Sequence, residues 1–134
     1  MPTIEYFAGH FDGEGCLRMK RHNNGWRLVA SVAACYYPVL DAYKAAFGGM
    51  IRPARSGSKK PIGEWSLHNQ PQLLAFLEAL APYSLEKKPQ LLIGIQWLHE
   101  RGKYSTYRVP YDFILYGNCC ASELSRLKRI SFPA

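Results

Sequence analysis

Two acidic residues stand close together at the carboxyl end of a predicted helix. The nine-residue segment FAGHFDGEG, residues 7–15, places Asp12 at the end of the helix expected over residues 3–12 and Glu14 two residues later. Thr3 is the expected N-cap, and Gly13 and Gly15 are the expected helix stops. The helix macrodipole is negative at this end and disfavours carboxylates there. A divalent cation such as Mg²⁺, held by carboxylate and backbone carbonyl oxygens, would compensate them. The residue chemistry alone also allows a glycine-terminated helix with two solvated acids.

Alternating residues predict the strands that follow this helix. Residues 16–22 and 26–34 alternate between two faces, and Asn23, Asn24 and Gly25 between them predict a hairpin turn. Gly48 and Gly49 end a helix over residues 38–47, and a second hairpin is expected from residues 50–53 and 63–67. Further helices are expected at residues 71–80, 86–100 and 121–130, whereas residues 101–117 are ambiguous. The order predicts an α+β fold with two αββ halves.

The basic charge is concentrated in the two predicted hairpins. The chain has 134 residues and a formal net charge of +7. Residues 15–63 contain nine Lys and Arg against one acid, Asp41, which makes this window +8 and the rest of the chain −1. The basic side chains alternate with apolar and aromatic residues, as expected on strands. Such a face is either simply solvated or binds a polyanion such as nucleic acid.

Composition excludes several other classes of protein. The length predicts a single domain, residues 1–134, and no uncharged stretch approaches the length of a membrane span. The amino-terminal segment carries acids and lacks a basic leader, so no secretory signal is expected. The four cysteines lack CxxC spacing. We therefore expect an intracellular protein in a reducing compartment.

The segment FAGHFDGEG resembles the LAGLIDADG motif of homing endonucleases, whose close variants read LAGFxDGEG. Two further segments support the resemblance: Phe47-Gly48-Gly49 precedes the third strand, and residues 86–90 (EKKPQ) resemble the KKxQ element of the family. The resemblance implies the αββαββα fold with a curved antiparallel β-saddle. Its core would cover residues 3–100, with a C-terminal helical extension over residues 101–134.

The resemblance also implies a cleavage site and a dimer. Glu14 and the carbonyl of Gly13 would bind the divalent metal, and Lys87 would be the active-site lysine, with Lys88 as the neighbouring candidate. Because the chain holds only one motif, the resemblance implies a homodimer that cuts one DNA strand with each copy. The dimer interface would contain Ala8, Gly9 and Asp12, with Asp12 capping the partner's motif helix. At the position where the family has a polar, water-organising residue, this chain has Ala34.

The saddle of this fold lies in the major groove of DNA, so the resemblance assigns alternate strand residues to base contacts. These residues are Arg18, Lys20, His22, Arg27, Val29, Ser31, Arg52, Glu64 and Ser66. The residues assigned to phosphate contacts are Arg21, Arg55, Lys59 and Lys60. Asn24 at the hairpin turn completes the predicted DNA-binding set.

The resemblance implies a Mg²⁺-dependent homing endonuclease that hydrolyses a phosphodiester in each strand of a long, nearly palindromic double-stranded DNA site. The alternative on the same fold is a non-cleaving binder, either an intron RNA maturase or a DNA-binding regulator. Glu14 favours cleavage, and Ala34 favours the binder. A third hypothesis is a small monomeric RNA-binding protein in which the Gly-Glu-Gly turn is incidental.

Overall fold

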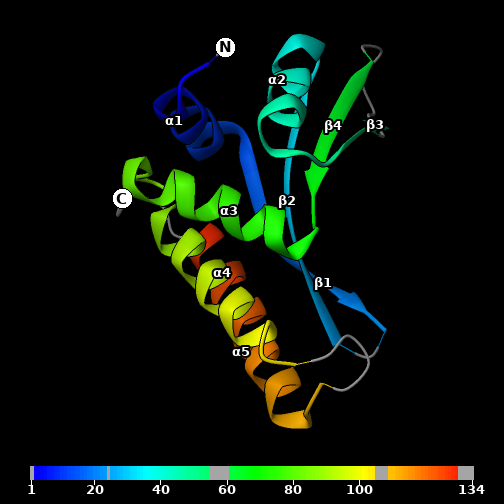
Figure 1. Ribbon diagram of the computed structural model, residues 1–134, viewed down its shortest axis with the longest axis vertical. Helices are drawn as coiled ribbons and strands as arrows, with labels where there is room; N and C mark the ends of the chain where they lie inside the picture. Colours follow the sequence, from blue (N-terminus) through cyan, green and yellow to red (C-terminus); the bar gives the residue numbers. More distant parts are fainter. Residues whose placement is uncertain (1, 24, 55–60, 105–108, 130–134) are drawn as a thin grey trace.

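The computed structural model describes residues 2–23, 25–54, 61–104 and 109–129. Its architecture is α+β, as the sequence predicts (Figure 1). The elements in chain order are α1 (Ile4–Glu14), β1 (Gly15–His22), β2 (Gly25–Ala34), α2 (Tyr37–Phe47), β3 (Met50–Ala54), β4 (Ile62–Leu67), α3 (Gln70–Leu80), the short 3-10 helix η1 (Ala81–Tyr83), α4 (Lys88–Arg101) and α5 (Tyr111–Lys128).

The four strands form one antiparallel sheet in the order β1-β2-β4-β3. Each predicted hairpin therefore forms, and the two hairpins join through β2 and β4 at the centre of the sheet. Asn23, which follows β1, has a φ of 46°, the left-handed conformation that the Asn-Asn-Gly turn predicts. In Figure 1 the β1–β2 hairpin extends alongside α4 and α5.

Alternation along the strands separates a core face from an open face. In β4, Gly63, Trp65 and Leu67 are buried, whereas the residues between them are half-buried. Leu17 and Leu28 continue the buried face on β1 and β2, where helices cover it. In Figure 1 the helices α3, α4 and α5 gather on one side of this sheet. The opposite face of the sheet carries the polar side chains.

Two glycines end α2, as the sequence predicts. Gly48 and Gly49 have φ values of 84° and 92°, a region that favours glycine. A Cβ on Gly49 would lie 2.5 Å from the carbonyl oxygen of Ser66. The turn is also held by Trp65, whose indole Nε1 donates to the carbonyl of Gly48 at 2.8 Å. The glycine pair thus links α2 to β3 at a point where no side chain fits.

The last helix is longer than the sequence predicts. The helix expected over residues 121–130 begins at Tyr111, directly after Pro110, and ends at Lys128. Residues of low helix propensity in its first half conceal it in the sequence, and packing overrides that propensity. Gly117 lies directly against Trp26, whose indole Nε1 donates to the Asn118 side-chain oxygen at 2.9 Å. Helix α5 is therefore part of the packed fold.

Over the described ranges, no helix is both long and apolar enough to cross a membrane. All four cysteines are free.

Candidate nucleic-acid interface

Helix α1 has one face in the core and one open face. Phe7, Ala8 and Phe11 are buried against the rest of the chain. Gly9 and Gly13 lie on the other side, where an added Cβ would meet no described heavy atom within 4 Å. The assignment of Ala8 to a dimer interface is therefore corrected. Ala8 is 1% exposed within one chain. It lies on the same helix face as Phe7 and Phe11, which pack into the core, so its side chain is buried there too.

The Asp12 carboxylate binds the loop before α4. Its Oδ1 accepts from the Ser84 hydroxyl at 2.5 Å and the Lys87 backbone N–H at 3.1 Å. Its Oδ2 accepts from the N–H groups of Leu85 and Glu86 at 2.8 and 3.1 Å. Partial burial by itself would raise the pKa of Asp12, but these hydrogen bonds outweigh it and hold the pKa below its usual range.

The role predicted for Asp12 toward a partner's motif helix stays a prediction. Within the chain, both of its carboxylate oxygens accept hydrogen bonds from residues 84–87. The sequence gives no sign of this loop, because residues 84–87 lie more than 70 positions away from Asp12. The bonds join the end of the motif helix to the segment that resembles the KKxQ element.

Lys87 lies at the same end of α1 as the predicted metal acid. Its side-chain Nζ donates to the backbone carbonyl of Asp12 at 2.7 Å, and Lys87 is the residue that precedes α4. Lys88 is instead exposed in the first turn of α4. The structure thus brings Lys87, and not its neighbour, onto the motif helix.

Glu14 is the exposed last residue of α1. It shares a surface hollow with Tyr6, His10 and residues 33–36, so Ala34 lies in the hollow beside the acid. The last turn of α1 contains no basic residue of its own, so the positive charge at this negative helix end comes from Lys87. Within the described ranges, no group of three or more His, Cys, Asp or Glu side chains is arranged to hold a metal. The carboxylate of Glu14 and the backbone carbonyls that a helix leaves unpaired at its end are oxygen donors of the kind that hard cations prefer.

His10 is the unusual residue of the motif, and its contacts explain why a polar side chain is tolerated there. Its Nδ1 shares a 2.8 Å hydrogen bond with the hydroxyl of Tyr43. Its ring also stacks on Tyr6, with centroids 5.8 Å apart. Burial raises the pKa of Tyr43, with a further contribution from Tyr6, so this hydroxyl stays protonated. His10 thus satisfies a phenol that would otherwise be buried without a partner.

The strand register places the predicted base-reading residues on one face of the sheet. Cross-strand partners share a face, and the pairs include Arg18 with Val29 and Lys20 with Arg27. The same face continues across the sheet through Ser31 and Ser66 and through Arg52 and Glu64. The alternation of the sequence therefore predicts this face correctly.

Two residues of the face are covered. Val29 and Ser31 are each 5% exposed in the free chain, so their assignment to base contacts is corrected. Both lie on β2, a central strand flanked by β1 and β4, where short side chains lie below their longer neighbours. Arg18, opposite Val29, is half-buried, and its Nε finds no partner among the described residues. The accessible part of the face is thus built mainly from longer side chains.

The remaining predicted contacts differ in position. Arg21 holds its guanidinium carbon 4.5 Å from the ring centroid of Trp26, on the face opposite Lys20. His22 and Arg27 are bonded to each other at the hairpin tip, with 2.8 Å between His22 Nε2 and Arg27 Nη2. The predicted contacts that lie outside the described residues are Asn24, Arg55, Lys59 and Lys60.

Comparison with known proteins identifies the fold. No protein-family model and no curated protein matches the chain significantly. Several solved structures do match, at low sequence identity. The homing endonuclease I-CvuI, bound to the I-CreI target with 2 mM Mg and with its DNA not cleaved, has a TM-score of 0.77 and 18% identity, over 98% of this chain and 85% of that one.

Two further structures cover nearly the whole chain. The archaeal intron-encoded homing endonuclease I-Vdi141I, complexed with DNA, has a TM-score of 0.77 and 18% identity, over 96% of this chain and 86% of that one. The homing endonuclease I-TnaI has a TM-score of 0.73 and 20% identity, over 96% and 95% of the two chains. A LAGLIDADG homing endonuclease, I-SmaMI, also matches. Together with the motif on α1 and the β1-β2-β4-β3 sheet, these likenesses show that the chain has the LAGLIDADG homing-endonuclease fold.

Proposed function

We propose that this protein is a LAGLIDADG homing endonuclease that binds a long, nearly palindromic DNA site as a homodimer and hydrolyses one phosphodiester in each strand. The observation that carries the proposal is the exposed Glu14 at the end of α1, where β1 begins and the polar sheet face starts. Neighbours of the same fold were crystallised with DNA, which supports duplex DNA as the substrate.

Glu14 and the carbonyl of Gly13 would hold a divalent metal, for which we propose Mg²⁺. When bound, the metal supplies a water of lowered pKa and neutralises charge on the phosphate. Glu14 is suited to this role because it is exposed and accessible to DNA. Lys87, held at the end of α1 by the Asp12 carbonyl, would place a positive charge beside the phosphate. Without such positive charges, the carboxylate and the phosphate would repel each other.

Homodimerisation follows from the need for a second Glu14 and from the open face of α1. Gly9 and Gly13 lie one turn apart and permit close approach of another helix. Three exposed apolar side chains accompany this face: Tyr6 on α1, Tyr83 in η1, and Leu85 in the loop that is hydrogen-bonded to Asp12. Leu85 is 87% exposed. Exposed apolar groups of this kind are typical of an interface.

Replacing Gly9 by leucine tests the dimer. The side chain would meet no atom of its own chain within 4 Å, and the helix loses a glycine, so the monomer should fold at least as stably. Close packing of two α1 helices would be blocked. We expect light scattering after gel filtration to give a dimer for the native protein and a monomer for Gly9→Leu. An unchanged dimer would place the interface elsewhere.

Replacing Arg18 by alanine tests base reading by the sheet face. We expect lost discrimination at one base pair in each half-site, worth about 1–3 kcal/mol, because a positioned arginine distinguishes guanine from other bases. Binding to targets varied at each position in turn measures this. The matched control is Arg21→Ala, on the opposite face over Trp26, which removes the same charge and should leave the base preference unchanged at every position. Uniform weakening by Arg18→Ala would contradict base reading.

The proposed activity is tested by selecting bound sequences from a random duplex library and incubating them with protein and Mg²⁺. We expect enrichment of a long, nearly palindromic site and staggered cleavage within it. Enrichment without cleavage favours the second candidate in its DNA-binding form, whereas failure to enrich any duplex favours an intron-RNA binder. Ala34 is the observation behind that candidate, because it puts a methyl group in the hollow beside Glu14.

A further inference from the structure

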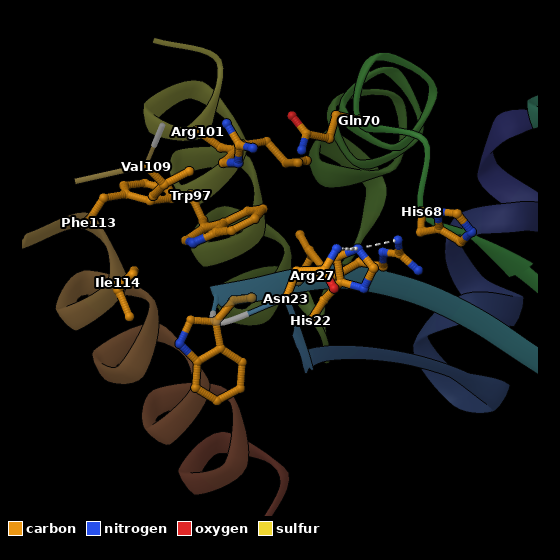
Figure 2. A pocket seen from close by; sticks show the side chains of 13 residues that line it. His22, Asn23, Arg27, His68, Gln70, Trp97, Arg101, Val109, Phe113 and Ile114 are labelled. Atoms are coloured by element: carbon orange, nitrogen blue, oxygen red, sulfur yellow. Dashed lines mark hydrogen bonds between the residues drawn. The ribbon is translucent and has the colours of Figure 1, made fainter. Parts of the chain in front are cut away.

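A second cavity lies at the far end of the β1–β2 hairpin from Glu14. It has a volume of about 380 Å³, within the range of small-molecule sites. Its walls come from the hairpin tip, the start of α3, the end of α4 and the start of α5. Figure 2 shows the Trp97 indole between Phe113, Val109 and Ile114 on one side and His22, Asn23 and Arg27 on the other. The cavity thus has an apolar side and a polar, basic side.

The basic side is suited to an anion. Arg27 and Arg101 line the cavity with His22 and His68, and none of the described residues that line it is acidic. Arg27 Nη2 donates to His22 Nε2, because a guanidinium has only donors, and this leaves the proton of the imidazole on Nδ1. Partial burial lowers the pKa of His68, and the charges of Arg27 and Arg52 lower it further. The field at this end of the sheet therefore favours negative charge.

The apolar side contains an unsatisfied donor. Trp97 is 1% exposed, and its Nε1–H has no acceptor in the described part of the chain. Buried indole N–H groups normally have a partner, and leaving one without is costly. Leu28, Leu98 and Phe113 are also buried at this cavity. A flat ligand with an acceptor atom on its edge would cover these residues and satisfy the donor.

We propose that this cavity binds an unpaired nucleotide, with the base against the apolar side and the phosphate on the basic side. An acceptor on the base would take the hydrogen bond of Trp97, and Arg27 would hold the phosphate. A phosphate of paired DNA would use the arginines alone and would leave the apolar wall and the Trp97 donor without a role. An unpaired base uses both, since base faces stack on aromatic and apolar surfaces. The inference goes beyond DNA cleavage and does not depend on it.

Calorimetric titration of the full chain with deoxyadenosine monophosphate tests the inference. We expect saturable binding of this nucleotide, and binding at least about tenfold weaker for deoxyadenosine or inorganic phosphate alone, since each lacks one half of the ligand. Trp97→Phe removes the N–H and retains an aromatic ring. It should weaken binding of the nucleotide about fivefold to tenfold. Circular dichroism checks that this core variant is folded.

A second variant keeps the test independent of the core. Arg27→Gln on the half-buried rim should weaken binding of the nucleotide about tenfold or more. The matched control Lys44→Gln, at an exposed position of α2 that does not line the cavity, also removes one positive charge and should leave nucleotide binding unchanged. Absence of saturable binding, or equal binding by native protein and both cavity variants, would overturn the inference. A duplex with one unpaired nucleotide distinguishes the sources. Tighter binding than to the fully paired duplex, lost in Trp97→Phe, assigns the pocket to a nucleic-acid strand, whereas no difference assigns it to free nucleotides.

Discussion

Replacing Glu14 by glutamine should leave DNA binding intact and reduce cleavage about a thousandfold. The amide keeps the shape of the exposed side chain but removes the negative charge that would hold the metal. Metal activation of water and phosphate is worth several kcal/mol, and about 4 kcal/mol corresponds to three powers of ten in rate. Single-turnover cleavage of the selected target, together with a binding titration in Ca²⁺, measures both quantities.

The matched control for this variant lies on the same helix. Glu5 is an exposed acid in the first turn of α1, one helix length from the proposed site. Glu5→Gln makes the same change in net charge and should cleave at the native rate. Equal rates for Glu14→Gln and the native protein would remove Glu14 from the mechanism. An equal reduction of the cleavage rate in both variants would indicate a general effect of net charge.

Replacing Asp12 by asparagine should destabilise the fold by about 2–4 kcal/mol and lower Tm by about 10 °C. Its carboxylate accepts four hydrogen bonds from residues 84–87. In asparagine, an NH2 group replaces one of the two oxygens, and this group cannot accept hydrogen bonds from the donors that face it. The loop that holds Lys87 would loosen, so cleavage should also fall. Urea unfolding measures the stability. The control is Asp41→Asn, an exposed acid on α2, which should stay within about 0.5 kcal/mol of the native value.

The same carboxylate predicts a dependence of stability on pH. The folded pKa of Asp12 lies below that of the unfolded chain, about 3.9, so its ionised form stabilises the fold. This contribution is fully present above the unfolded pKa and is lost as pH falls through the folded pKa. The difference in free energy of unfolding between the native protein and Asp12→Asn should therefore have its full value at pH 6 and become smaller below about pH 4. A difference independent of pH would mean that the variant acts through packing alone.

Local patterns predicted the strands because one face of the sheet is buried. Leu17, Trp65 and Leu67 point to the core, and the residues between them carry the charges, so period-two alternation is visible in the sequence. Gly48 and Gly49 likewise mark a turn that their positive φ values require. The hairpins and their shared polar face were therefore predictable.

The errors arise where distant segments meet. The small size of Ala8 suits close approach of two helices and so predicts a dimer surface, but its side chain is buried in the hydrophobic core of its own chain. The bonds from Asp12 to a loop more than 70 positions away were likewise not predictable from a local pattern. Helix α5 contains Gly117, which lowers its propensity but allows Trp26 to approach. The nucleotide cavity draws on four separate segments, so no local pattern indicates it.

The measurement that tests endonuclease activity most directly is incubation of the native protein with uninterrupted DNA that joins the sequences flanking its reading frame. Both strands carry end labels, and parallel reactions contain Mg²⁺ or EDTA. We predict one cut in each strand, staggered about the centre of a nearly palindromic site, in Mg²⁺ only and absent in Glu14→Gln. Tight binding of this DNA by native protein with neither strand cut in Mg²⁺ would contradict the proposal.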